Sequence, residues 1–215
     1  MWIKICGIRD VETALAVAQS RPNAIGLNFY YKSPRAVGFE TALEIVSRLP
    51  SEVEPVGVFV NEPAETIRGL CRRCGITTVQ LHGVEPPERI AELDEFRVIR
   101  AFRVNAQDGL GPIESYLADC RRFDALPWAC LIDAQVAGAY GGTGQSAPWE
   151  VVRRYPTAEW PPLILAGGLS PDNVAQAVRE VAPWGVDVAS GVESSIAFKD
   201  PELVRQFVAS ASASR

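Results

Sequence analysis

Cys6 and Asp133 are the two residues of this 215-residue chain that best suit acid–base chemistry. Each ends a short apolar run, Trp2–Cys6 and Ala129–Asp133. The N–H dipoles of a following helix can lower the pKa of a thiol and so supply thiolate as a base. A buried aspartic acid with a raised pKa can donate a proton near neutral pH. Structural roles remain open for both, because cysteine also packs as a small apolar residue and aspartate also caps helices.

Glycine-rich turns follow the last two apolar runs of the chain. Gly167 and Gly168 lead into Ser170–Asp172, which predicts a helix start with serine as the N-cap and proline in the first turn. Ser190 and Gly191 follow the next run. Backbone N–H groups in such turns can point at an anion, and glycine lets the backbone approach it closely. Two such turns in succession predict a phosphate site, although either could be a bare turn.

Three further features could contact a substrate. Arg35, in Ser-Pro-Arg, could hold a carboxylate with its planar fork or simply lie on the surface. His82 is the single histidine, and we expect it to line the pocket without being the principal base. Gly142 and Gly144 belong to a glycine-rich segment that could close over a substrate or merely link two elements.

Alternating short apolar runs and amphipathic stretches must position these residues. The predicted strands are Trp2–Cys6, Ala24–Phe29, Glu54–Val60, Thr78–His82, Val98–Val104, Ala129–Asp133, Leu163–Ala166 and Val186–Ser190. The predicted helices are Val11–Ser20, Thr41–Leu49, Ala64–Cys74, Pro87–Leu93, Ile113–Phe123, Trp149–Arg154, Asn173–Val181 and Pro201–Ala209. Nearly continuous Ile, Val and Leu in several of the strands indicates that both faces are covered.

Eight strands alternating with eight helices predict an α/β protein, a single (β/α)8 TIM barrel domain that spans residues 1–215. A doubly wound open sheet is the alternative, but it normally places its glycine-rich phosphate loop after the first strand. Here the glycines come late, as in barrels that bind phosphate after strands seven and eight. The candidate residues stand at strand ends or in the loops that follow them, where a barrel forms its active site.

Composition narrows the class of protein. The chain has 21 basic and 26 acidic residues, a net charge of −5, and shows no basic cluster that would bind nucleic acid. It has no apolar run long enough to span a bilayer and no signal-peptide pattern, so we expect a cytoplasmic protein without membrane association. Five irregularly spaced cysteines argue against a disulfide framework. Cys71 and Cys74 form one CxxC, which we interpret as packing or surface placement because a zinc site needs about four ligands.

Taken together, these residues resemble the phosphoribosylanthranilate isomerase family over nearly the whole chain. The segments that carry the resemblance are Lys4–Ile8, Phe29 with Lys32–Arg35, Val56–Asn61, Val79–Gly83, Leu131–Asp133 with Gly141–Gly144, Leu165–Leu169 and Val186–Glu193. Each segment alone is a weak signal, but seven in register are specific. Asn28 and Tyr31 depart from many relatives, which predicts a different shape for their loop.

The resemblance implies a reaction, an Amadori rearrangement of N-(5-phosphoribosyl)anthranilate to 1-(2-carboxyphenylamino)-1-deoxyribulose 5-phosphate. It implies that Asp133 is the general acid, that Cys6 is the general base and that Arg35 holds the anthranilate carboxylate. The turns at Gly167–Gly168 and Ser190–Gly191 would hold the phosphate. No metal and no organic cofactor is implied, because the substrate nitrogen is the electron sink. The expected partner is a small phosphorylated substrate, bound by a monomer or a homodimer.

Three other functions remain open from the sequence. A related phosphosugar barrel of the histidine or tryptophan pathway is one, although the histidine-pathway isomerase is expected to use two aspartates and Cys6 occupies the first of those positions. A Schiff-base aldolase using Lys4 is another, and it needs a desolvated amine at the reacting centre. A binding module without catalysis would leave the acid, the base and the anion site idle.

Overall fold

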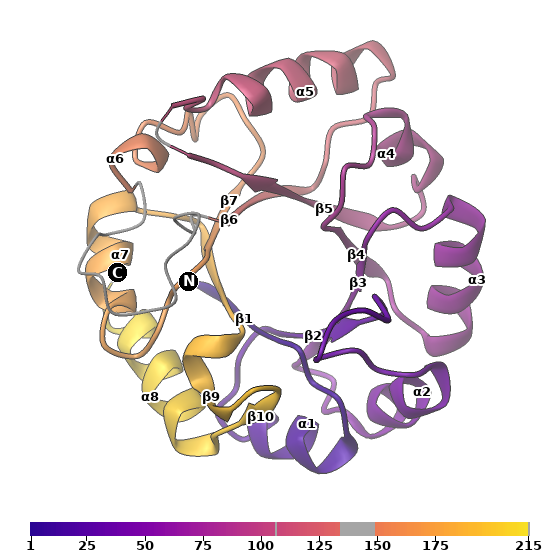
Figure 1. The fold of residues 1–215 in the computed structure, drawn as a ribbon, viewed down its shortest axis with the longest axis vertical. Helices are drawn as coiled ribbons and strands as arrows, with labels where there is room; N and C mark the ends of the chain where they lie inside the picture. The colour runs from indigo at the N-terminus through magenta and orange to yellow at the C-terminus, as the bar shows by residue number, and fades with distance from the viewer. Residues whose placement is uncertain (106, 134–148, 215) are drawn as a thin grey trace.

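The computed structural model describes residues 1–105, 107–133 and 149–214. Eight parallel strands pair in chain order, and β1 also pairs with β8, so the sheet closes into a barrel. Figure 1 looks down this barrel and shows the helices as an outer ring. The predicted (β/α)8 fold is therefore confirmed.

The strands and helices lie close to their predicted bounds. The barrel strands are β1 (Trp2–Cys6), β2 (Ala24–Asn28), β3 (Glu54–Phe59), β4 (Thr78–Leu81), β5 (Arg97–Arg103), β6 (Ala129–Asp133), β7 (Leu163–Ala166) and β8 (Gly185–Val188). The helices are α1 (Val11–Ala18), α2 (Phe39–Arg48), α3 (Ala64–Cys74), α4 (Glu88–Glu92), α5 (Gly111–Arg122), α6 (Trp149–Val152), α7 (Val174–Val181) and α8 (Pro201–Ser212). Three short elements follow β8, namely the 3-10 turn η1 (Ser190–Val192) and a hairpin of β9 (Glu193–Ser195) and β10 (Phe198–Lys199).

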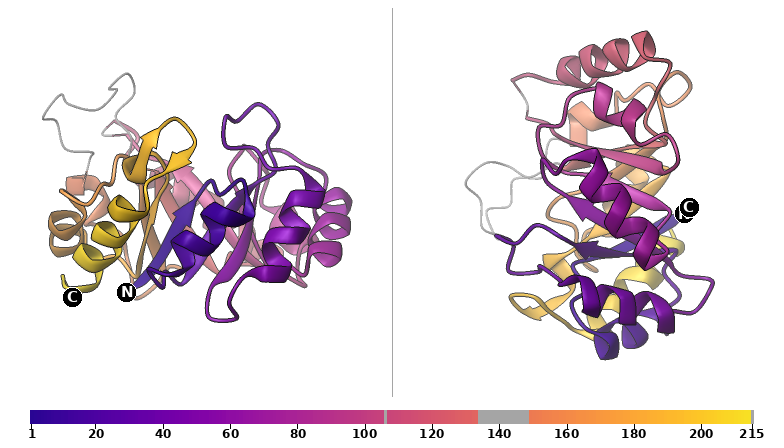
Figure 2. Two further views of the ribbon diagram at one scale, coloured as in Figure 1. Left: turned by 90° about the horizontal axis from the view of Figure 1, so that it is seen from below. Right: turned by 90° about the vertical axis from the view of Figure 1, so that its right-hand side faces the viewer.

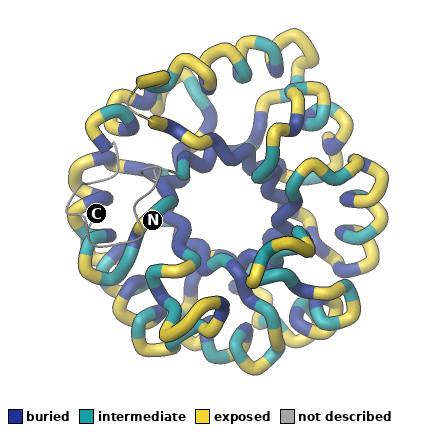
Figure 3. Tube along the Cα trace, in the orientation of Figure 1, coloured by how far each residue is buried: buried dark blue, intermediate teal, exposed yellow. Residues whose placement is uncertain are grey.

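Two layers of apolar residues hold the barrel together. Residues facing out from the strands pack against the buried stripes of the helices. Figure 3 shows the strands as mostly buried and the outer sides of the helices as mostly exposed. Helix α7 is an example, because its predicted stripe of Val174, Ala177, Val178 and Val181 is buried. The barrel interior holds a second, smaller cluster of Ala24, Val56, Ile99, Ala101, Ala129, Leu131, Ile164 and Ala166.

Three tryptophans close the barrel at the end where the strands begin. Trp2 stacks on Trp184 with ring centroids 5.5 Å apart, and Trp128 meets both rings edge-on at 6.2 and 5.2 Å. The two termini also lie at this end, and the β9–β10 hairpin lies at the other, as the left view of Figure 2 shows. One end of the barrel is thus filled by aromatic rings, which leaves the carboxyl ends of the strands for a site.

Two details differ from the sequence prediction. The eighth strand ends at Val188, so Ser190 lies in the turn η1 and not in the strand. The hairpin that follows was not predicted, because strands of three and two residues are too short to give an alternating pattern. Among the described residues, every helix falls short of the length and apolarity that crossing a membrane requires.

Candidate active site

Cys6, His82 and Asp133 stand at the carboxyl ends of three barrel strands. Cys6 is the last residue of β1 and Asp133 the last of β6. His82 directly follows β4, and its N–H donates to the carbonyl of Phe59 at 2.8 Å, which continues the ladder by one residue. The Asp133 carboxylate acts electrostatically on His82, so the two side chains share one mouth. The structure therefore brings the predicted acid, base and histidine to the same end of the barrel.

A buried ion pair lies next to Cys6 inside the barrel. Lys4 shares a face of β1 with Cys6 and stands opposite Asp187 in the β1–β8 register. Its ammonium donates to the Asp187 carboxylate at 2.7 Å, and its side chain is fully buried. Burial lowers the pKa of Lys4, but the Asp187 carboxylate and the Cys6 thiolate raise it more, so its net pKa lies above the usual value. Lys4 is therefore a cation and not a free amine.

The surroundings of Cys6 shift the pKa of its thiol in opposite directions. Burial is the largest effect and raises its pKa, and the Asp187 carboxylate raises it further. The ammonium groups of Lys4 and Lys199 lower it, without cancelling the rise. The expected lowering by a helix dipole is not found, because α1 begins only at Val11 and its N-terminus is capped by the Asp10 side chain. Cys6 is a thiol near neutral pH, and its thiolate, when formed, is a strong base.

His82 is a neutral imidazole in this site. Burial lowers its pKa more than the nearby carboxylates of Asp133 and Asp187 raise it. The Gln80 amide nitrogen lies 2.9 Å from His82 Nδ1. Since an amide nitrogen only donates, Nδ1 is the acceptor and the ring proton is on Nε2. His82 can thus offer one N–H to a ligand at the mouth, in line with a pocket role.

Arg35 is tied to Glu193, a residue 158 positions away. Its Nε and Nη2 donate to Glu193 Oε1 and Oε2, both at 2.7 Å. Lys199 donates to the same carboxylate at 2.7 Å and to the carbonyl of Ala189 at 2.8 Å. Burial raises the pKa of Glu193, but its hydrogen bonds with the two cations outweigh this and hold the pKa at about 2. The predicted carboxylate-binding arginine is therefore already oriented by a carboxylate of the chain.

The side chain of Asn28 shapes the loop that carries Arg35. Asn28 accepts from the N–H of Tyr30 at 2.9 Å and donates to the Ser33 hydroxyl at 3.1 Å. Ser33 in turn accepts from the N–H of Arg35 at 3.1 Å. Tyr31 lies at the outside of this loop with 77% of its surface exposed. Asn28 thus fixes the loop with hydrogen bonds.

The two predicted phosphate turns touch each other. Gly167 and Gly168 both adopt left-handed backbone angles, with φ of +86° and +65°. A side chain at Gly191 would place its Cβ 1.8 Å from the carbonyl oxygen of Leu169, so only glycine permits this approach. The loops after β7 and β8 therefore form one continuous backbone surface, the place where barrels commonly bind phosphate.

The start of the helix after this surface differs from the prediction. Helix α7 begins at Val174 with Asn173 in the N-cap position, so Ser170 is not its N-cap. The Asn173 side chain accepts from the N–H of Ser170 at 2.8 Å and donates to the carbonyl of Gly168 at 2.9 Å. Pro171 and Asp172 form a turn before the helix. Asn173 thus braces the turn that contains Gly168, a role that the Ser-Pro pattern did not predict.

Two other features of the sequence analysis remain, the glycine-rich segment and the CxxC. Gly142 and Gly144 lie outside the described residues. Cys71 and Cys74 are buried in the core along α3, which confirms the packing interpretation of this CxxC.

Sequence reasoning missed several charged residues at this end of the barrel. Asp187 interrupts the apolar run of β8. A charged residue inside a buried strand is the signal from which it could have been predicted as a site residue. Glu193 and Lys199 gave no signal of their own, because their pairing depends on the hairpin. Arg103 ends β5 and stands opposite Asp133 in the β5–β6 register.

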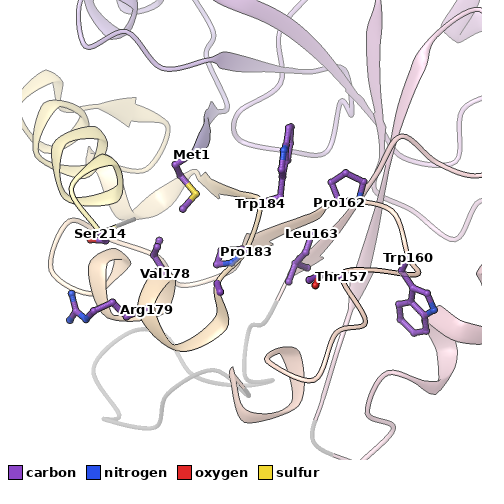
Figure 4. Close-up of a pocket in the computed structure, with 11 residues that line it drawn as sticks. Met1, Thr157, Trp160, Pro162, Leu163, Val178, Arg179, Pro183, Trp184 and Ser214 are labelled. Atoms are coloured by element: carbon purple, nitrogen blue, oxygen red, sulfur yellow. The ribbon is translucent and has the colours of Figure 1, made fainter.

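A cavity of about 550 Å³ at the opposite end of the barrel does not suit this chemistry. Figure 4 shows its lining, which includes Met1, Pro162, Pro183 and Trp184. Of the described residues around it, Arg179 alone is charged. The predicted acid and base, Asp133 and Cys6, end strands at the other end of the barrel and do not line this cavity.

Comparison with known proteins identifies the family of the chain. A family model described as N-(5'phosphoribosyl)anthranilate (PRA) isomerase matches residues 3–210. N-(5'-phosphoribosyl)anthranilate isomerase of Trichlorobacter lovleyi is 43% identical over 209 residues, which cover 97% of each chain. The crystal structure of phosphoribosyl anthranilate isomerase from Thermotoga maritima is similar with a TM-score of 0.85 and 37% identity, over 98% of each chain. A second such structure, solved in complex with reduced 1-(o-carboxyphenylamino)-1-deoxyribulose 5-phosphate, has a TM-score of 0.82 and 35% identity over 98% of each chain. The chain belongs to the N-(5'-phosphoribosyl)anthranilate isomerase family.

Proposed function

We propose that this protein catalyses the Amadori rearrangement of N-(5-phosphoribosyl)anthranilate to 1-(2-carboxyphenylamino)-1-deoxyribulose 5-phosphate. The observation that carries the proposal is the meeting of Cys6, Asp133 and a two-loop glycine surface at one end of a barrel whose whole length matches the family. An acid, a base and an anion site are the three parts that this reaction needs.

In the proposed mechanism, Asp133 acts first. Its carboxylic acid protonates the ribose ring oxygen, the bond from that oxygen to C1 breaks, and the nitrogen lone pair forms an iminium with C1. Cys6 thiolate then removes the proton from C2, and the electron pair of that C–H bond becomes the C1–C2 double bond of an enolamine. Loss of the 2-hydroxyl proton and protonation of C1 give the ketone. The substrate nitrogen accepts the electrons, so the chemistry uses no cofactor.

The position of Cys6 fits its proposed role. The thiol is partly buried beside the Lys4 and Lys199 ammonium groups, which favour its charged form, while burial keeps the thiolate basic. A base of raised pKa is matched to a weakly acidic C–H bond. His82 would donate its Nε2 proton to a substrate oxygen, and Gly142 and Gly144 would line the substrate.

The two ends of the substrate would be held by opposite sides of the mouth. Arg35 would take the anthranilate carboxylate with the edge of its guanidinium that Glu193 leaves open. The backbone N–H groups around Gly167, Gly168, Ser190 and Gly191 would take the phosphate. The reacting carbons, which lie between the two anionic groups, would then fall between Cys6 and Asp133.

The aldolase alternative is weakened by the state of Lys4. A Schiff base requires a neutral amine, but Lys4 is fully buried in an ion pair that raises its pKa. Borohydride trapping should therefore leave the protein unlabelled.

We further propose that residues 1–215 work as one cytoplasmic barrel domain, as a monomer or a homodimer. The last helix supports the single domain, because α8 packs against both α1 and β1 and so joins the two ends of the chain. Light scattering after size-exclusion chromatography distinguishes the two assemblies.

A fluorescence assay tests the proposed activity directly. Pure protein should abolish the fluorescence of freshly made N-(5-phosphoribosyl)anthranilate faster than its spontaneous breakdown, and mass spectrometry should identify the isomeric ketone. A protein that leaves the substrate unchanged, with its fold intact by circular dichroism, would overturn the proposal.

A further inference from the structure

We infer that Glu193 is a positioning residue that sets the carboxylate specificity of the site by fixing the guanidinium of Arg35. The inference rests on the proposed function, in which Arg35 binds the substrate carboxylate. Glu193 itself would not contact the reacting atoms. It would act through Arg35 on one part of the substrate, the acidic group on the aromatic ring.

The pairing of Arg35 and Glu193 uses one edge of the guanidinium. Nε and Nη2 donate in parallel to the two carboxylate oxygens, each at 2.7 Å. A guanidinium has five N–H groups, and the remaining three lie on Nη1 and on the outer side of Nη2. Those groups form a second edge that binds a carboxylate in the same paired manner. Glu193 therefore fixes the plane of Arg35 while leaving the geometry for a substrate carboxylate.

Glu193 is itself held on three sides. Lys199 donates to Oε1 at 2.7 Å, and the N–H of Ala197 donates to Oε2 at 3.1 Å. The side chains of Glu193 and Lys199 are 4% and 1% exposed, whereas that of Arg35 is 22% exposed. The carboxylate is thus the buried base of the network, and the guanidinium is the part that reaches the mouth.

The stem of Arg35 is restrained as well. It passes over Gly7, where a Cβ would lie 2.6 Å from Arg35 Cδ. With its stem against Gly7 and one guanidinium edge on Glu193, Arg35 has few rotamers left. A side chain that is ordered before the ligand arrives loses less entropy on binding, so an organised arginine binds a carboxylate more tightly than a mobile one.

The network also suggests a role for the hairpin of β9 and β10. Glu193 begins β9 and Lys199 ends β10, so the two short strands bring a carboxylate and its counter-cation together beside the loop after β2. Ala197 adopts a left-handed φ of +67° at the turn, where its N–H reaches Glu193. The hairpin thus places the Glu193 carboxylate beside Arg35.

A pair of ligands tests this inference. One is reduced 1-(o-carboxyphenylamino)-1-deoxyribulose 5-phosphate, and the other is the same molecule with a plain phenyl ring. In Glu193→Ala, we expect the affinity for the carboxylate ligand to fall by about tenfold or more. The affinity for the phenyl ligand should change by less than about twofold, because its phosphate and sugar contacts do not involve Arg35. With substrate, KM should rise while kcat changes little.

Matched variants separate positioning from damage to the fold. Glu193→Gln keeps one acceptor oxygen and the side-chain volume, so its loss should be smaller but show the same ligand selectivity. Glu95→Ala is the control. It removes a carboxylate that accepts from Nε and Nη2 of Arg72, on helix α3, at 2.8 and 2.9 Å. That control should leave both affinities unchanged. In Arg35→Ala, adding Glu193→Ala should produce no further loss for the carboxylate ligand.

Three results would overturn the inference. Unchanged affinities in Glu193→Ala would mean that Arg35 needs no support. Equal losses of affinity for both ligands would indicate a general structural role of Glu193. Tighter binding of the carboxylate ligand would mean that Glu193 competes with that ligand for Arg35. The proposed function fails differently. If Arg35→Ala did not discriminate between the two ligands, the carboxylate clamp itself would be wrong, whatever Glu193 does.

Discussion

At the scale of single residues, the proposed reaction depends on the ionisation of the Cys6 thiol. Cys6 is partly exposed, and the four other cysteines are buried, so Cys6 is the one expected to react with a small alkylating agent. Burial and Asp187 raise its pKa, and Lys4 and Lys199 lower it. The thiolate fraction therefore grows as pH rises through and above neutrality, and the rate of alkylation should follow it.

Two substitutions should move that profile in opposite directions. Lys4→Met removes a cation and should shift the alkylation of Cys6 to higher pH, and Asp187→Asn removes an anion and should shift it to lower pH. The measurement is the rate of iodoacetamide labelling of Cys6 against pH, with Cys6→Ser as the blank. Shifts of the same sign, or no shift in either variant, would contradict the electrostatic account. Since each variant breaks a buried ion pair, a stability loss of about 3 to 5 kcal/mol is also expected.

Residue types and strand ends were enough to predict Cys6, Asp133, Arg35 and His82 as candidates. The partners that tune them could not be predicted in this way. The pairing of Arg35 with Glu193 joins positions 158 apart, and it exists only because a closed barrel brings the second and last loops together. The direction of the pKa shift of Cys6 was also hidden, because burial cannot be measured along a sequence.

At the scale of elements, the loops after β7 and β8 can form the proposed phosphate site only if they touch. The contact depends on Gly191, whose Cα faces the carbonyl of Leu169. Gly191→Ala would force the loops apart, since a Cβ would lie 1.8 Å from that oxygen. We expect the KM for the phosphorylated substrate to rise by about tenfold or more, because charged ligands lose strong hydrogen bonds there.

A second glycine provides the matched control for this prediction. Gly69 lies within helix α3, and a Cβ there would meet nothing within 4 Å. Gly69→Ala should leave KM unchanged and stabilise the protein by about 0.5 to 1 kcal/mol, because alanine favours the helix. Urea unfolding and steady-state kinetics on both variants check the pair. An unchanged KM in Gly191→Ala would contradict the role of the loop contact.

Element bounds were predictable wherever a pattern was long enough to be read. The strand Trp2–Cys6 and the helix Ala64–Cys74 match their predictions, because apolar runs and helical spacing define both ends. The hairpin of Glu193–Ser195 and Phe198–Lys199 is too short for any period to emerge. The predicted cap of α7 was wrong, because Asn173 and not Ser170 occupies the N-cap position.

At the scale of the whole molecule, the barrel separates stability from chemistry. Trp2, Trp128 and Trp184 pack against one another at the end where the strands begin, and the proposed acid and base lie at the other end. Barrel enzymes in general keep their catalytic residues at the carboxyl ends of the strands. Substitutions in the tryptophan cluster should therefore weaken the fold without touching catalysis.

Trp184→Ala tests this separation. It removes one stacked and one edge-on aromatic contact, so we expect a loss of about 2 to 4 kcal/mol in the free energy of unfolding. Below the unfolding temperature, kcat should stay within about twofold of the wild-type value, because no reacting group moves. Chemical denaturation and turnover measured on the same sample decide the matter. A large fall in kcat with little loss of stability would show that the two ends are coupled.

The most direct measurement compares the turnover of Cys6→Ala and Asp133→Asn with that of the wild-type protein on N-(5-phosphoribosyl)anthranilate. Each change removes one proton-transfer group while leaving the barrel strands intact. The proposed mechanism predicts that each variant folds, as shown by circular dichroism, and that each loses turnover by roughly 100-fold or more. Near wild-type turnover in either folded variant would contradict the assignment of that residue as base or acid.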